Sequence, residues 1–171
     1  MAIHAFTVVL GREPTDDEFD VLGVTCNDGG FVHGPGLSYV QFDREAPTLA
    51  DAIASAVRDL EAAGLAALRV QDEDLLTLAD IAVRIGQSRE SVRRYATGDR
   101  GPGGFPPPVN PAREGTVFYR WCEAAPWVRE HLGIDVPDTD PALVVANLIL
   151  QARQHRHRVE HMSALSDLLA A

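Results

Sequence analysis

The stretch from Leu76 to Thr97 reads LTLADIAVRIGQSRESVRRYAT and predicts two short helices joined by a tight turn. Ala82 is small enough to lie where two helices cross at the ~90–120° typical of such a pair. Gly86 can adopt the positive φ that ends one helix and redirects the chain. Val92 then falls on the inward face of the second helix, toward two isoleucines of the first. The stretch therefore predicts a helical pair with a small core of its own.

Each predicted helix has its own start signal. Thr77 is followed three residues later by Asp80, which is typical of a capping box, and Ser88 lies where the second helix needs an N-cap. With Val92 inward, the outward side chains are Arg89, Glu90, Arg93 and Arg94. Arginines on an exposed helix can contact phosphates or form a forked pair with guanine. The alternative is an ordinary helical hairpin with a solvated basic face.

The segment from Leu76 to Gly133 resembles the winged helix-turn-helix of the excisionase and MerR-like group of bacterial DNA-binding proteins. The matching stretches are LTLADIAVRIGQSRESVRRY, a Gly/Pro-rich loop ending in FPPPV, and VFYRWCEAAPWVREHLG. The resemblance implies that residues 88–97 form a recognition helix, that a β-hairpin wing follows, and that the Trp-containing helix packs back on the helix-turn-helix motif. The DNA-binding residues expected on this basis are Ser88, Arg89, Glu90, Arg93 and Arg94 on the helix, with Arg100 and Arg113 on or beside the wing.

Charge is distributed unevenly along the chain. The net charge of −10 by itself argues against a nucleic-acid binder. Residues 1–76 contain 4 Arg against 14 Asp and Glu, residues 77–133 contain 8 against 6, and residues 134–171 contain 3 against 5. The only positive segment carries the helical pair. Because its excess is small, we expect modest and strongly salt-sensitive attraction to phosphates.

The sequence lacks the residue patterns that several kinds of catalytic or metal site require. All fifteen basic side chains are arginine, so a P-loop lysine and a lysine Schiff base are excluded. Cys26 and Cys122 show neither zinc-ligand nor disulfide-framework spacing, which favours two packed thiols. His157, Glu160 and His161 match the HxxEH zinc-peptidase pattern, but a solvated His/Arg patch is the favoured interpretation of this polar stretch. We expect no enzymatic activity, no metal and no cofactor.

Residues 1–74 alternate strand and helix signals. The expected strands are 4–10, 31–32, 37–42 and 65–70, with helices after Thr15 and over 48–63. The order β-α-β-β-α-β predicts a ferredoxin-like domain, a fold that hosts many functions. Dimerisation, ligand sensing and docking of a basic protein all stay open for it. The acidic cluster from Asp72 to Asp74 is interpreted as a solvated linker.

The residues after the helical pair contain rigid loops and two tryptophans. The stretch from Gly98 to Pro111 is rich in glycine and proline and suits a wing. A returning strand is expected over Val117–Trp121, and a helix over Cys122–Leu132. Trp121 and Trp127 are interpreted as core residues in preference to base-stacking platforms.

Residues 134–171 are expected to form a helical arm. An apolar stripe runs from Val144 to Leu169 with spacings of mostly three or four residues. A helix of about 30 residues would be about 45 Å long, too long to pack wholly on one small domain, and its exposed stripe predicts a homodimer. The alternative is two shorter helices folded on the same chain.

The sequence thus predicts an α+β protein with domains 1–74, 75–133 and 134–171. Its expected function is sequence-specific binding of double-stranded DNA as a dimeric transcriptional regulator. The alternative is a protein-binding module, such as an antitoxin whose acidic N-terminal domain binds a basic partner. No apolar run is long enough to cross a membrane and no signal peptide opens the chain, so we expect a cytoplasmic protein without a membrane partner.

Overall fold

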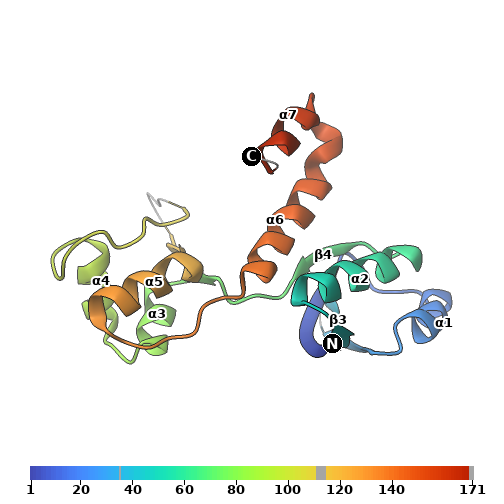
Figure 1. Ribbon diagram of the computed structural model, residues 1–171, viewed down its shortest axis with the longest axis horizontal. Coiled ribbons are helices and arrows are strands. Elements are labelled where there is room, and N and C mark those ends of the chain that lie inside the picture. Colours follow the sequence, from blue (N-terminus) through green and yellow to red (C-terminus); the bar gives the residue numbers. More distant parts are fainter. Residues whose placement is uncertain (35, 111–114, 170–171) are drawn as a thin grey trace. The chain divides into compact units, whose positions relative to one another are not determined.

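The computed structural model describes residues 1–34, 36–110 and 115–169, and its fold is α+β (Figure 1). The chain divides into two compact units. Unit 1 contains Met1–Gln71 and Val145–Ala171, and unit 2 contains Asp72–Val144. The C-terminal segment, expected as a separate arm over 134–171, therefore groups with unit 1 from Val145 onward.

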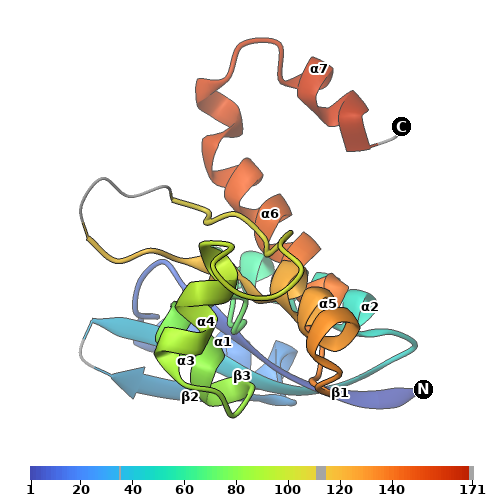
Figure 2. The ribbon, with the colours of Figure 1, turned by 90° about the vertical axis from the view of Figure 1, so that its left-hand side faces the viewer.

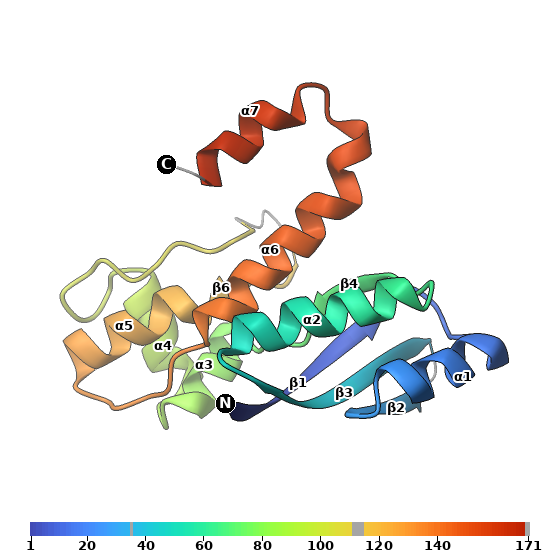
Figure 3. The ribbon, with the colours of Figure 1, turned by 45° about the vertical axis from the view of Figure 1, so that its right-hand side comes forward.

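Unit 1 is built on a four-stranded antiparallel sheet with the order β2-β3-β1-β4. Its first six elements are β1 Ala2–Leu10, α1 Asp16–Thr25, β2 Gly29–Gly34, β3 Leu37–Ala46, α2 Leu49–Ala62 and β4 Ala67–Val70. They follow the order expected from the sequence. The helices α1 and α2 lie over one face of the sheet (Figure 3).

The period of two along β3 separates the two faces of this sheet. Val40 and Phe42 are buried on the face that the helices cover, where Phe42 lies opposite Phe6 of β1, whereas Asp43 and Glu45 are exposed. A charged residue, Arg44, is also buried on the covered face. Its guanidinium pairs with Asp28 at 2.7 Å and with Asp59 of α2 at 2.7 Å, so this cation ties β3 to α2.

The C-terminal helix α6, Pro141–His155, supplies polar side chains to the edge strand β4. The Asn147 amide accepts a hydrogen bond from the Val70 N–H at 2.8 Å and donates one to the Val70 carbonyl oxygen at 2.9 Å. Gln154 donates to the Leu68 carbonyl oxygen at 2.8 Å. These bonds occupy backbone groups that an edge strand otherwise leaves free.

The prediction of a single long C-terminal helix is wrong. After α6 come the short helix η1 Arg156–Arg158, then α7 Met162–Ser166 and η2 Asp167–Leu169. The chain leaves the helical path at Val159, which is extended, and at His161, whose φ is +54°. Shorter helices on the same chain, the alternative interpretation, are what the structure contains.

Unit 2 contains two helices followed by a third, with a short two-stranded sheet. Its elements are β5 Leu75–Leu76, α3 Leu78–Arg84, α4 Arg89–Ala96, β6 Tyr119–Arg120 and α5 Trp121–Leu132. The strand expected over Val117–Trp121 is only two residues long, because Trp121 already begins α5. It pairs with β5.

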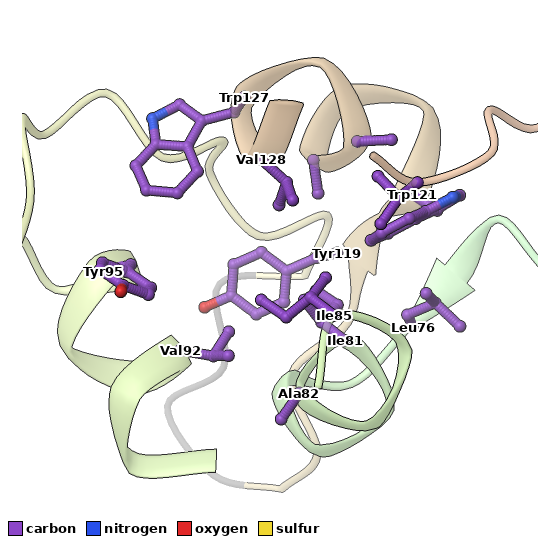
Figure 4. Packing of buried hydrophobic residues seen from close by; sticks show 13 residues of the cluster. Leu76, Ile81, Ala82, Ile85, Val92, Tyr95, Tyr119, Trp121, Trp127 and Val128 are labelled. Atoms are coloured by element: carbon purple, nitrogen blue, oxygen red, sulfur yellow. The ribbon is translucent and has the colours of Figure 1, made fainter. Parts of the chain in front are cut away.

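The core of unit 2 gathers side chains from α3, α4 and α5 (Figure 4). Ile81 of α3 and Ile85, which follows its last residue, face Val92 of α4, as the sequence predicted, and all three are buried. Trp121 and Trp127 are also buried, which confirms their interpretation as core residues and removes both from the surface available to bases. One member of the acidic cluster is buried too. Asp74 is only 1% exposed, so the prediction of a solvated linker is wrong at this residue.

Candidate nucleic-acid interface

The helices α3 and α4 (Figure 2) follow each other directly in unit 2. A four-residue turn, 85–88, joins them, and local hydrogen bonds determine where each begins. Both bonds of the capping box are present: the Thr77 N–H donates to the Asp80 carboxylate at 2.8 Å, and the Asp80 N–H donates to the Thr77 hydroxyl at 3.2 Å. Gly86 has a φ of +67°, which a side chain would disfavour. The Ser88 hydroxyl accepts from the Ser91 N–H at 3.1 Å and so caps α4.

The exposed side of α4 carries the side chains that the sequence placed there. Val92 and Tyr95 point into the core, and the exposed residues are Ser88, Arg89, Glu90, Arg93 and Arg94. We call this set the α4 surface. The α4 surface thus carries three arginines and one carboxylate on the solvent side of a short helix.

Arg93 is held by an acidic neighbour. Its Nη2 lies 2.7 Å from Glu90 Oε1 and its Nε lies 2.9 Å from Glu90 Oε2, so the pair is forked. A second carboxylate, Asp99, lies 3.7 Å from Arg93 Nη1. The hydrogen bonds from Arg93 lower the pKa of Glu90 and keep it ionised. Arg93 is therefore oriented and partly neutralised, which the sequence spacing did not reveal.

Arg89 and Arg94 are the uncommitted cations of the α4 surface. Both side chains are exposed, and within the described residues neither has a hydrogen bond or an ion pair. A guanidinium without a protein partner keeps its full set of donors for a phosphate or a base edge. These two arginines are thus better placed than Arg93 to receive an anionic ligand directly.

Arg100 lies against α4. Its guanidinium carbon is 5.3 Å from the centroid of the Tyr95 ring, and its Nη1 donates to the Ser91 hydroxyl at 3.4 Å. The resemblance placed this residue on or beside a wing. In the structure the loop after α4 turns back, so that Arg100 joins the border of the α4 surface.

A tryptophan anchors this glycine-rich loop. Trp127 of α5 donates from Nε1 to the Gly103 carbonyl oxygen at 2.9 Å, and its ring contacts those of Tyr95 and Phe105. Gly101, with a φ of +83°, passes close to Tyr95: a Cβ there would lie 3.2 Å from Tyr95 Cδ1. Arg100 is therefore positioned through a packed loop, an arrangement that motif spacing could not show.

The segment expected to form the wing has two described arms, 97–110 and 115–118, which are hydrogen-bonded to each other. The Val109 N–H donates to the Phe118 carbonyl oxygen at 2.8 Å. The Asn110 side chain accepts from the Phe118 N–H at 2.8 Å and donates to the Thr116 carbonyl oxygen at 2.9 Å. Neither arm forms a strand within 97–110 or 115–118. Arg113, the other predicted wing residue, lies outside the described residues.

Other kinds of site are not seen in the part of the chain that the structure describes. No three His, Cys, Asp or Glu side chains gather as metal ligands within it. Both cysteines are free thiols; burial raises the pKa of Cys26, and burial together with the neighbouring Asp74 raises the pKa of Cys122 to about 11. Among the described helices, none combines the length and the apolar character needed to span a bilayer.

Comparison with known proteins found no matching family model, no matching curated protein and no matching solved structure.

Proposed function

We propose that this protein binds double-stranded DNA sequence-specifically, with α4 as the element that enters the major groove. The observation that carries the proposal is the division of α4 into a buried side, Val92 and Tyr95, and an exposed side with three arginines, two of which have no ion pair to any described residue. An α-helix fits the major groove, and arginine is the side chain that most often pairs with guanine there. A transcriptional regulator is the class of protein that this function implies.

The proposal includes a finer description of both units. In unit 2, α3 and α4 would be a helix-turn-helix, and the glycine- and proline-rich segment that begins at Gly98 would be its wing, as the resemblance implies. In unit 1, the antiparallel order β2-β3-β1-β4 with α1 and α2 on one face supports a ferredoxin-like fold. The predicted winged helix-turn-helix and the ferredoxin-like domain are thus both part of the proposal.

Within the α4 surface the arginines would have different tasks. Arg89 and Arg94 are free to contact phosphates or guanine. Arg93 is held by Glu90, so it would approach DNA in one orientation, and Glu90 could accept a hydrogen bond from cytosine N4. A half-site that contains G·C pairs is the expected ligand.

The protein is proposed to act as a homodimer through its C-terminal helices. Val145, Leu148 and Ile149 of α6 are exposed apolar residues, as are Leu165 and Leu168 after it. The side of α6 that carries Asn147 is already used at β4, and a second copy can cover the apolar side with the same residues, as twofold symmetry requires. Two recognition helices would then read an inverted repeat with half-sites about 34–36 Å apart.

A second candidate function rests on the acidic character of unit 1. Met1–Gln71 contains 4 arginines and 11 acidic residues, and β3 exposes Asp43 and Glu45 side by side on one face. Such a surface is complementary to a basic protein, as in an antitoxin bound to its toxin. This second candidate would be favoured if the protein co-purified stably with one basic protein and did not bind DNA.

Selection of bound sequences from a random duplex library tests the proposal. The full-length chain is compared with Arg89→Gln/Arg94→Gln and with the matched control Arg58→Gln/Arg69→Gln, which removes two exposed arginines of unit 1 instead. We expect the native protein and the control to enrich the same motif and the α4 variant to lose it. Enrichment of that motif by the α4 variant would contradict the proposal. The proposal would also be contradicted if the native protein enriched no motif.

A further inference from the structure

A cluster of basic residues begins at His155, the last residue of α6, and continues past the end of that helix. Residues 155–161 read HRHRVEH and contain two arginines, three histidines and one glutamate; we call them the basic turn. Every residue from 151 to 161 is exposed. The sequence alone suggested a solvated patch, and the structure adds that two of its cations are available to a ligand.

The arginines of the basic turn differ from most others in unit 1. Arg12 pairs with Glu18, Arg44 with Asp28, and Arg153 with Glu61. Arg156 and Arg158, by contrast, have neither a hydrogen bond nor an ion pair to any described residue through their side chains. The glutamate inside the turn, Glu160, is also exposed and forms no ion pair with them.

The presence of Arg156 and Arg158 is not explained by an interaction with the C-terminal end of α6. Cations in the last turn of a helix interact favourably with its C-terminal carbonyl groups, and Arg153 and His155 occupy that turn. Arg156 and Arg158 follow the end of α6. They also give the segment Val145–Ala171, with 3 arginines against 2 acidic residues, a charge opposite in sign to that of Met1–Gln71, with 4 arginines against 11 acidic residues.

We propose that the basic turn is a second DNA-binding surface, which contacts the phosphodiester backbone through Arg156 and Arg158. A guanidinium presents paired donors that match two phosphate oxygens, and such contacts carry no information about base sequence. The proposal rests on the proposed function and extends it to a part of the chain outside unit 2. Because the turn and α4 belong to one chain, phosphate binding by the turn adds to binding by α4 as an intramolecular event.

The salt dependence of DNA affinity tests this surface. The native full-length chain is compared with Arg156→Gln/Arg158→Gln, the turn variant, and with the control Arg58→Gln/Arg69→Gln, which also removes two positive charges from unit 1. Affinities for a selected duplex and for a shuffled duplex are measured at several salt concentrations, and the mass of each protein in solution is measured alongside. Each phosphate contact contributes about one unit to the magnitude of the slope of log affinity against log salt concentration. We therefore expect the slope of the turn variant to be smaller in magnitude by about two units, equally on both duplexes. The control is expected to keep the native slope.

The possible outcomes separate this inference from the proposed function. A turn variant with the native slope and affinity overturns the inference while α4-dependent sequence preference stands. A second outcome also overturns the inference: the turn variant forms fewer dimers, but the dimers that remain bind DNA with the native salt slope. The basic turn would then contact the acidic surface of a second copy and not DNA. Native protein that binds both duplexes equally, with weaker binding by the turn variant, supports the turn and refutes sequence-specific recognition. Native protein that binds neither duplex overturns both.

Discussion

The Asp74 carboxylate caps a helix that begins far away in the sequence: its Oδ1 accepts a hydrogen bond from the Cys122 N–H at 2.7 Å, 48 residues further along the chain. Its Oδ2 accepts one from Arg120 Nη1 at 2.9 Å, and its backbone carbonyl oxygen accepts one from the Trp121 N–H. The residue before α5, Arg120, makes no side-chain cap of its own. Asp74 therefore supplies the acceptors that the first turn of α5 lacks.

We expect Asp74→Ala to destabilise unit 2 strongly. The substitution removes the cap of α5 and leaves the Arg120 guanidinium without its buried partner, at a combined cost of about 2–4 kcal/mol in the free energy of unfolding. Chemical denaturation followed by tryptophan fluorescence measures it, because Trp121 and Trp127 lie in this core. Glu73→Ala is the control: Glu73 is exposed and pairs with Arg84 at the surface, so its loss should cost less than about 1 kcal/mol. Equal effects of the two substitutions would refute the role of Asp74.

Gly101→Ala should loosen the loop that carries Arg100. Both Gly101 and Gly103 have positive φ, so alanine at either is expected to cost about 1–2 kcal/mol through the backbone alone. At Gly101 the added Cβ also meets Tyr95, whereas at Gly103 it meets nothing within 4 Å. Thermal unfolding should show a larger loss for Gly101→Ala than for Gly103→Ala. The steric argument fails if Gly103→Ala is as damaging.

Glu90→Gln is expected to strengthen DNA binding and make it less selective. The neutral side chain no longer neutralises Arg93, which becomes free to pair with phosphates of any sequence. Affinity for a shuffled duplex should rise and the dependence on salt should steepen by about one phosphate contact. Glu130→Gln removes a charge of the same sign from α5 and is the control. A fall in affinity for every duplex would contradict this role of Glu90.

The ion pair between Arg12 and Glu18 predicts a pH dependence in unit 1. The Arg12 hydrogen bonds, followed by the one from the Thr15 N–H, lower the pKa of Glu18 to about 2. Because the folded-state pKa lies below the value of about 4.3 expected for an unfolded chain, the pair stabilises the fold above about pH 4.3. This contribution is lost as the pH falls toward about 2.

NMR titration of the Glu18 carboxyl group measures this pKa directly. Arg12→Gln should raise it toward the unfolded value, although the capping bond from Thr15 keeps part of the shift. Arg58→Gln changes an exposed arginine of α2 that donates to the Ala54 carbonyl oxygen and pairs with no carboxylate among the described residues, so it should leave the Glu18 pKa unchanged. An unaltered Glu18 pKa in Arg12→Gln would show that the ion pair does not form in solution.

Local signals along the chain accounted for the helices that carry the candidate site. Thr77, Asp80 and Ser88 act on backbone groups within three residues, and a spacing of three or four residues sufficed to place Val92 inside and Arg94 outside. The order of strands and helices in residues 1–70 followed from strand-forming runs and from the helix start signals at Thr15 and Thr48. The returning strand before α5 was less predictable, because its length depends on pairing with β5, more than 40 residues earlier.

The sequence by itself determined the α+β class, the start of α3 and α4, and the set of side chains on the exposed side of α4, because each depends on neighbours within about one helical turn. Only the tertiary structure decided which carboxylate caps α5, that Asn147 binds the edge of β4 from 77 residues away, and that Arg100 lies over Tyr95. Such contacts depend on how packed elements meet in space. A spacing rule that spans a few residues carries no information about them.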